Sequence, residues 1–549
     1  MRTFSDLHRA AHCGDVETVE KLVGDGNADI DLQDLAGFTA LHHAAKHGHN
    51  KIVMHLVNAR ASLDKLNDRN QTALALASKR GYSKVVETLL HAGADVHGTR
   101  TDHRQTPLFH AVCKGWVPIT KALLKAGADV NDGFKNGKVL YWATCKGYSS
   151  MVKILLAAGA DPNCAMQFSD PSRYFGLLHP GKLEDTPLHA ACRNGSDDIA
   201  EMLIAAGADI DARLRDEWTP LHVAVCSSQR WVEKLSRHDI SKLFGRMGWG
   251  RQRSGWDTDL GAVNCMNFLG NIYRHQHLRL VDLLVQTASE QNRVDYINGG
   301  TLRALNRTAL HLAIACGNGD MVDKLLALGA NISAADKNGW QALHFAACFG
   351  HVELLDKLRT AGADLNACGI MDGITPLHCA IHGLHVHVVR KLVEMGALID
   401  EKRQNVLHYA LSTEQRPLFN SREKVHLEEI VQILIDAGVD VNRENRSGWS
   451  QPAIILASIA CNSKLVKMLI DAGANVNQRA LNSRVKYNAL EEVTAKNFVI
   501  SETERTKCAD LLLDAGAVVS AEFLKSFSWH SNAYNQLVIM KKLEAISKK

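Results

Sequence analysis

Ala92-Gly93-Ala94-Asp95 returns along the chain as Ala126-Gly127-Ala128-Asp129 and again as Ala158-Gly159-Ala160-Asp161. The three glycines lie 34 and then 32 residues apart, and related endings continue almost to the last residue. A fixed period near 33 residues is typical of arrays in which each unit is one supersecondary element that buries its apolar face only against its neighbours. The pattern therefore predicts a long stacked array rather than one large core, and it favours binding as the class of function.

A complete unit opens with Gly339-Trp340-Gln341-Ala342-Leu343-His344 and ends with Ala361-Gly362-Ala363-Asp364-Leu365-Asn366. Several units open with a threonine followed by a proline, as in Thr186-Pro187. Threonine caps a helix, and a proline at the first helical position sacrifices no hydrogen bond. A glycine then breaks the chain, a second helix follows with Val and Leu at helical spacing, and the glycine of the ending closes that helix in a left-handed turn. Each unit is therefore predicted to be a pair of short helices.

Thr-Pro-Leu-His stands at residues 186–189, 219–222 and 375–378, and Ala-Gly-Ala-Asp endings recur throughout. On these residues the chain resembles the ankyrin-repeat proteins over about nine-tenths of its length. The resemblance implies an all-α solenoid of paired antiparallel helices with β-hairpin finger loops. It also implies a curved stack whose concave face, lined by the fingers and the first helices, binds a partner.

The endings count the units: Gly26, Arg60 in place of a glycine, Gly93, Gly127, Gly159, Gly207, Gly329, Gly362, Gly396, Gly438, Gly473 and Gly516. Between Gly207 and Gly329, one clear helix starts at Thr219 and a degenerate helix pair runs through Met266–Val285. Counting both as units gives fourteen, which we prefer to thirteen with a longer insertion.

The predicted organisation has four parts. They are N-terminal repeats at 1–226 with a loop insertion at 165–183, degenerate repeats at 227–306 with a Gly/Arg/Trp-rich insertion at 237–261, C-terminal repeats at 307–523 with an insertion at 412–425, and a capping segment at 524–549. An array needs a polar terminal face to stay soluble, so we expect an amphipathic capping helix at 533–547.

Composition points to a reduced compartment. The formal net charge is only +4, and the thirteen cysteines include no Cys-x-x-Cys pair. The start is polar and carries no signal-peptide pattern, and the longest apolar stretch, near Ala453–Ala460, is too short to cross a bilayer. We expect an intracellular protein with free thiols and no membrane insertion, in the cytoplasm, with the nucleus as the alternative.

Catalytic interpretations are disfavoured. Seven histidines share one position of the repeat, which predicts a structural role: His42, His189, His222, His311, His344, His378 and His408. A metal site around His378, His382, His385 and His387 is disfavoured because no Cys or carboxylate stands at ligand spacing. No phosphate-binding glycine loop, nucleophile elbow or kinase signature is present. We expect no enzyme activity, no catalytic residue, no cofactor and no metal.

The variable positions carry the functional prediction. In five consecutive N-terminal units a cation precedes the glycine between the two helices, and the residue after that glycine is often aromatic. These residues are Lys46, Lys79, Arg80, Lys114, Lys146 and Arg193, with Tyr82, Trp116 and Tyr148. The matching C-terminal positions are nearly neutral. We expect a cationic stripe that binds an acidic partner, with charge giving selectivity and aromatic residues giving affinity. The alternative is a solvated helix edge with aromatic rings packed between repeats.

A second set of aromatic residues precedes the helix cap, on the fingers: Phe38, Trp218, Trp340 and Trp449. Large aromatic side chains on exposed hairpins are good binding anchors. The alternative is that each packs against the next finger.

The leading interpretation is a scaffold or adaptor that binds another protein and performs no chemistry. One alternative is an adaptor that recruits a ubiquitin ligase or a signalling enzyme, although no SOCS-box or F-box pattern is evident at the C-terminus. Alternatives of another class are an enzyme-linked effector and a nucleic-acid binder, the latter suggested by the cations and tryptophans of 237–261. The small net charge and the absence of a nucleic-acid module disfavour it.

Overall fold

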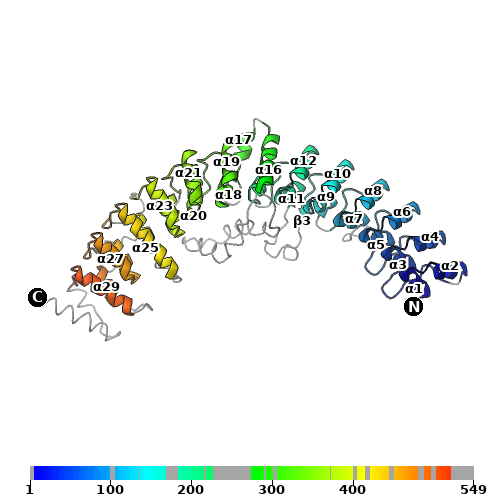
Figure 1. The fold of residues 1–549 in the computed structure, drawn as a ribbon, viewed down its shortest axis with the longest axis horizontal. Helices are drawn as coiled ribbons and strands as arrows, with labels where there is room; N and C mark the ends of the chain where they lie inside the picture. Colours follow the sequence, from blue (N-terminus) through cyan, green and yellow to red (C-terminus); the bar gives the residue numbers. More distant parts are fainter. Residues whose placement is uncertain are drawn as a thin grey trace. The chain divides into compact units, whose positions relative to one another are not determined.

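A computed structural model describes residues 5–26, 28–98, 106–134, 137–167, 184–214, 218–226, 274–289, 292–300, 306–370, 373–399, 405–413, 421–443, 451–479, 487–495 and 502–520. These residues form two compact units, of which the first ends at Tyr296 and the second begins at Ile297. Figure 1 labels helices of both units, coloured by their place in the sequence. The division falls inside the segment predicted to be degenerate, whose boundaries at 226 and 306 stay predictions.

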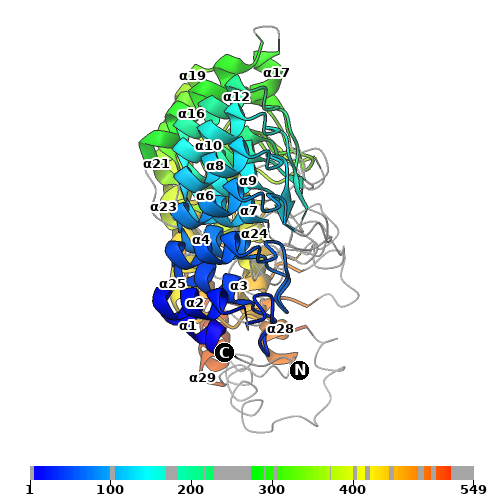
Figure 2. The ribbon, with the colours of Figure 1, turned by 90° about the vertical axis from the view of Figure 1, so that its right-hand side faces the viewer.

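The first unit is a stack of helix pairs. The first helices are α1 (Asp6–Cys13), α3 (Ala40–His47), α5 (Ala73–Arg80), α7 (Pro107–Lys114), α9 (Val139–Cys145), α11 (Pro187–Asn194) and α13 (Pro220–Cys226). The second helices are α2 (Val16–Gly24), α4 (Asn50–Asn58), α6 (Ser83–His91), α8 (Val117–Lys125), α10 (Ser149–Ala157), α12 (Asp197–Ala205) and α16 (Arg274–Thr287). Each helix packs against its partner and against the corresponding helix of the next pair, so that α2, α4, α6 and α8 lie side by side (Figure 2).

The second unit repeats this arrangement. Its first helices are α18 (Ala309–Ala315), α20 (Ala342–Phe349), α22 (Pro376–His382), α24 (Val406–Thr413), α26 (Ala453–Ile459) and α28 (Ala489–Ala495). Its second helices are α19 (Gly319–Ala327), α21 (Val352–Thr360), α23 (Val386–Glu394), α25 (Ser421–Asp436), α27 (Ser463–Asp471) and α29 (Glu502–Asp514). The short α17 (Arg293–Asn298) lies between the pairs of α16 and α18 in the sequence. The predicted all-α solenoid of helix pairs is confirmed.

Local chemistry sets the helix limits. The Thr39 side chain accepts a hydrogen bond from the His42 backbone N–H, and the Thr39 N–H donates to the His42 ring, which closes a capping box at the start of α3. The helix ends at Gly48, whose φ of +80° is the left-handed conformation that glycine adopts without strain. Small and aliphatic residues such as Ala44, Ala45 and Leu56 are fully buried between the pairs, and they form the core of the stack.

The fingers contain little regular sheet. In the described residues, β1 (Gly133–Phe134) pairs with β2 (Gly137–Lys138), and β3 (Met166–Gln167) pairs with β4 (Glu184–Asp185), both antiparallel. Other fingers turn through side-chain hydrogen bonds. The Oδ1 atom of Asp336 accepts from the backbone N–H of Asn338 at 2.8 Å and of Trp340 at 2.9 Å, which is an Asx turn.

The described residues contain thirteen helix pairs, the lower of the two predicted counts. The helices α13 and α16, expected in separate units, are the two helices of one pair: α16 packs against α13 as a second helix does, and against α12, the second helix before it. His277 of α16 also covers Gly195, as residues at the start of other second helices cover the preceding pair's glycine. The insertion therefore lies between the two helices of a single repeat, and not between two repeats.

The other insertions are partly described. Residues 421–425, predicted as inserted loop, are the start of α25, which has 16 residues where α23 has nine. The insertion therefore lengthens a second helix. Of 165–183, only Met166–Gln167 is assigned, to strand β3, and Asp185 follows in β4. Residues 237–261 and the predicted cap at 524–549 lie outside the described residues.

Arg60 offers a test of the register. It occupies the left-handed ending position with φ of +62° and is exposed. A non-glycine residue in this conformation destabilises the folded state by about 1–2 kcal/mol. Glycine costs about 0.5–1 kcal/mol instead, because it makes the unfolded chain more flexible. We therefore expect Arg60→Gly to raise the free energy of unfolding by about 0.5–1 kcal/mol. Thermal unfolding followed by circular dichroism measures the change, and a lower melting temperature would contradict the assigned register.

Candidate partner-binding surface

Recurring histidines tie several first helices to the next finger. In His42, Nδ1 accepts from the Thr39 backbone N–H at 3.1 Å, which leaves the proton on Nε2, and Nε2–H donates to the Gln71 carbonyl at 3.0 Å. His344 does the same, with Nε2–H donating to the Ile374 carbonyl at 3.0 Å. Burial lowers the pKa of both histidines to about 4, so the rings are neutral near pH 7. Their predicted structural role is confirmed.

The histidines of the segment 378–387 also make contacts within the stack of repeats. The ring of His378 contacts the Thr375 hydroxyl at 2.8 Å, His382 contacts the Tyr409 hydroxyl at 3.0 Å, and His385 Nε2–H donates to the Cys348 carbonyl at 2.9 Å. These contacts point the three rings at different neighbours.

Four of the six predicted cations form one exposed set. Lys79, Arg80, Lys114 and Lys146, the cationic strip, stand at the C-terminal ends of α5, α7 and α9, and all are exposed. Burial lowers the pKa of His110 to about 4, and the positive charges of Lys79 and Lys114 add to that shift, so both cations lie near this ring. Within the described part of the chain, none of the four forms an ion pair.

Lys46 differs from the strip. Its Nζ lies 5.1 Å from the centre of the Phe38 ring, which is a cation–π contact, and both side chains are half-buried. Phe38 thus packs on its own repeat. Its ring also contacts the ring of His43, at a ring-centre distance of 5.3 Å. This pair is a less accessible binding element than expected.

Arg193 belongs to a buried network rather than to the strip, which corrects the prediction. It donates to Asp185 Oδ2 at 2.8 Å, and the exposed fractions of the two side chains are 21% and 7%. The Tyr141 hydroxyl donates to the same carboxylate oxygen at 2.7 Å. Burial raises the pKa of Tyr141 well above its ordinary value, with the Asp185 charge acting in the same direction. No sequence pattern predicts the contact between Tyr141 and Asp185, because an insertion separates Asp185 from α9.

The aromatic residues after the glycine pack between repeats. A Cβ atom at Gly48 would lie 2.7 Å from the Tyr82 ring, one at Gly81 2.7 Å from Trp116, and one at Gly115 3.3 Å from Tyr148. Each ring therefore covers the helix end of the preceding repeat, as the alternative interpretation states. Tyr82 and Trp116 nevertheless keep 37% and 39% of their surface exposed, beside the cationic strip. They combine packing with an accessible edge.

The expectation of exposed finger tryptophans is wrong for Trp218 and Trp340, which are each 2% exposed. The Trp340 indole lies against the next finger, 3.5 Å from a Cβ position at Gly369, and its ring stacks on His344 at 5.9 Å. The next finger covers the Trp340 ring, and because both rings are buried, neither can anchor a partner in this structure. Trp449 lies outside the described residues.

Asparagines at the finger entry form another tie between repeats. Asn163 accepts from the Asp209 backbone N–H at 2.7 Å and donates to the Gly207 carbonyl at 3.0 Å. Asn477 makes the same two bonds with Val518 and Gly516. These side chains satisfy backbone groups that the helix end leaves unpaired. No helix within the described residues is long and apolar enough to cross a membrane.

Comparisons with known proteins agree with the geometry. The sequence profile described as "Ankyrin repeats (3 copies)" matches residues 7–100, 97–166, 173–242, 269–368 and 343–421, more than half of the chain. Ankyrin repeat and SOCS box protein 5 of Mus musculus is 38% identical over 85 residues, which are 14% of this chain and 25% of that protein. The protein of the same name in Oryctolagus cuniculus is 43% identical over 58 residues, 11% of this chain and 17% of that protein. The chain thus matches at most about a quarter of the length of these relatives.

Two solved structures are also similar. The human ASB11 ankyrin repeat domain has 25% sequence identity and a TM-score of 0.34, over 40% of this chain and 91% of that one. The ankyrin repeat domain of Bcl-3 has 29% identity and a TM-score of 0.35, over 41% of this chain and 95% of that one. On the matched repeats, with their caps, left-handed glycines and stacked helix pairs, the chain belongs to the ankyrin repeat family.

Proposed function

We propose that this protein is a non-enzymatic scaffold that binds an acidic segment of a partner protein along the cationic strip. Ankyrin repeats bind protein partners, and the family supports this general class of function. The observation that carries the finer proposal is the set of four exposed cations on three consecutive first helices, without ion pairs among the described residues. We place the protein in the cytoplasm on its composition alone.

The physical basis is electrostatic complementarity with an aromatic edge. Adjacent like charges repel one another in the free protein, so an acidic segment relieves this repulsion when it binds. The exposed edges of Tyr82 and Trp116 add apolar contact beside the charges. The recurring histidines, which could otherwise suggest catalysis, are used in structure: His42 and His344 each donate a hydrogen bond to the backbone of the next finger.

We expect the charge reversal Lys79→Glu, Arg80→Glu, Lys114→Glu and Lys146→Glu to weaken binding of a fluorescein-labelled Asp/Glu-rich peptide at least tenfold, which is about 1.4 kcal/mol. Fluorescence anisotropy measures the affinity at low and moderate salt, because screening should weaken the wild-type interaction. A peptide with Asn and Gln in place of the acids is the ligand control.

The matched control variant reverses four other lysines of the same repeats: Lys84, Lys121, Lys125 and Lys153, all exposed on second helices. It has the same change in net charge on another face, so it separates the strip from the overall charge. Equal loss of affinity in the two variants, or unchanged affinity in the strip variant, would refute the proposal. Melting temperatures of both variants check that the fold is retained.

A second candidate function follows from the relatives. The matched mouse and rabbit proteins are named for a SOCS box besides their ankyrin repeats, which favours an adaptor that recruits a ubiquitin ligase. Affinity purification of the full chain, followed by an assay of ubiquitin transfer to the captured protein, tests this role. Capture of a partner without any ligase subunit would leave the scaffold as the better description.

A further inference from the structure

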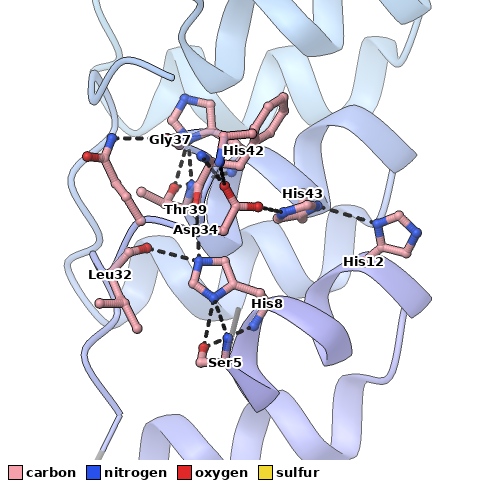
Figure 3. Close-up of polar contacts among 12 residues, drawn as sticks. Ser5, His8, His12, Leu32, Asp34, Gly37, Thr39, His42 and His43 are labelled. Atoms are coloured by element: carbon pink, nitrogen blue, oxygen red, sulfur yellow. Dashed lines mark hydrogen bonds and ion pairs between the residues drawn. The ribbon is translucent and has the colours of Figure 1, made fainter. Parts of the chain in front are cut away.

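The rings of His12, His43 and His47 meet where the first two repeats pack together. Figure 3 shows the contact between His12 and His43. His12 is in the last turn of α1, and His43 and His47 lie four residues apart on α3, so they share one face of that helix. One ring nitrogen of each lies within 4.8 Å of the others. In the described part of the chain, this is the one group of three or more His, Cys, Asp or Glu with such spacing.

The distances fit a bound metal ion. The Nδ1 atoms of His12 and His43 are 3.4 Å apart. Two nitrogens bound to Zn²⁺ at about 2.0–2.1 Å with a tetrahedral angle are separated by about 3.4 Å. The rings of His12 and His47 have centres 4.2 Å apart, which brings the third ligand to the same point. A hydrogen bond between His12 and His43 would explain the closeness of these two rings, but not that of His47. The Nε2 atom of His47 is buried without a hydrogen-bond partner among the described residues.

The Asp34 carboxylate orients the His43 ring through the ring nitrogen that faces away from His12. His43 Nε2–H donates to Asp34 Oδ2 at 3.0 Å, so the Nδ1 lone pair faces His12 (Figure 3). Asp34 is fixed in turn, because its Oδ1 accepts from the Ala36 backbone N–H at 2.9 Å and from the Phe38 N–H at 2.8 Å. A carboxylate bonded to the far nitrogen of a ligating histidine is the usual outer partner in zinc sites.

The same positions at later repeat interfaces do not hold three histidines. The residue equivalent to His12 is Lys46 at the next interface and Lys79 at the one after it. The residues equivalent to His43 and His47 are Leu76 and Arg80, and then His110 and Lys114. The stack therefore brings these positions together at each interface, and the first interface alone of these three fills them with imidazoles.

We propose that His12, His43 and His47 bind a Zn²⁺ ion across the first two repeats, with Asp34 as the positioning residue. Three neutral imidazoles suit Zn²⁺, and the exposed side of His12 leaves the fourth coordination position to water. The bound ion links α1 to α3 and stabilises the N-terminal end of the array.

The test uses the full chain after removal of metal with a chelator. Isothermal titration calorimetry with Zn²⁺ gives the affinity, and Co²⁺ substitution reports the ligands through its absorption spectrum. We expect His12→Ala and His47→Ala each to weaken Zn²⁺ binding at least tenfold. Asp34→Asn keeps the acceptor for the turn but cannot accept from His43, and we expect a loss of about 10–100-fold. Zn²⁺ should also raise the melting temperature of the wild type, but not of His12→Ala or His47→Ala.

His91→Ala is the matched control, because His91 is an exposed histidine at the end of α6, far from the three rings in sequence. It should bind Zn²⁺ like the wild type. The proposal is overturned if the wild type shows no binding, or if His12→Ala and His47→Ala bind as tightly as His91→Ala. A thiolate-to-cobalt charge-transfer band would also overturn it, since it would place the ion at some of the thirteen cysteines.

Discussion

Replacement of Trp340 by alanine is expected to lower the free energy of unfolding by about 3–5 kcal/mol, the range for buried Trp or Phe truncations. The side chain is 2% exposed and lies between the finger of its own repeat and that of the next. It also makes an edge-to-face contact with Phe345 at a ring-centre distance of 6.0 Å. Truncation therefore leaves a cavity between two fingers that the backbone closes only in part.

Urea denaturation followed by circular dichroism measures this loss, with Trp116→Ala as the matched control. Trp116 is 39% exposed, so its truncation should destabilise by only about 1 kcal/mol while it weakens partner binding. If Trp340→Ala left stability unchanged and reduced affinity, the indole would be a binding anchor after all, and the packed arrangement described above would be wrong.

The second large effect is expected at Asp185. The change Asp185→Asn keeps the shape of the side chain but leaves the Arg193 guanidinium, one-fifth exposed, without its counter-charge. Burial lowers the pKa of Arg193, whereas the charge of Asp185, the neighbouring Tyr141 and Cys145 groups and the hydrogen bond to Asp185 together raise it above its ordinary value. Breaking a buried ion pair costs about 3–5 kcal/mol, and we expect about 3 kcal/mol because Arg193 keeps some contact with water.

A double-mutant cycle with Arg193→Met gives the interaction energy directly. With both charges removed, stability should recover most of the loss, since the penalty comes from the unpaired cation. Lys146→Met on α9 is the control for an exposed cation, and it should leave the urea midpoint within error of the wild type. Additive losses at Asp185 and Arg193 would show that the two side chains do not interact in solution.

The repeat, its helix pairs and the role of the shared histidines follow from the local pattern of residues. Caps and left-handed glycines act within a few residues, so Thr39, Gly48 and Gly93 could be assigned from local spacing alone. A histidine that recurs at one position of several units, as His42 and His344 do, meets the same neighbours each time, and its hydrogen bond to the next finger follows from that recurrence.

Which of the variable side chains are accessible depends on how the repeats stack. Trp340 is covered by a finger one repeat later, Tyr141 of α9 reaches Asp185 across an insertion, and α13 packs against α16 beyond a long break. The approach of His12 to His43 also depends on the tertiary structure, because the two residues come from different repeats. Contacts between residues distant in sequence depend on how repeats stack, whereas local spacing encodes only the repeat itself.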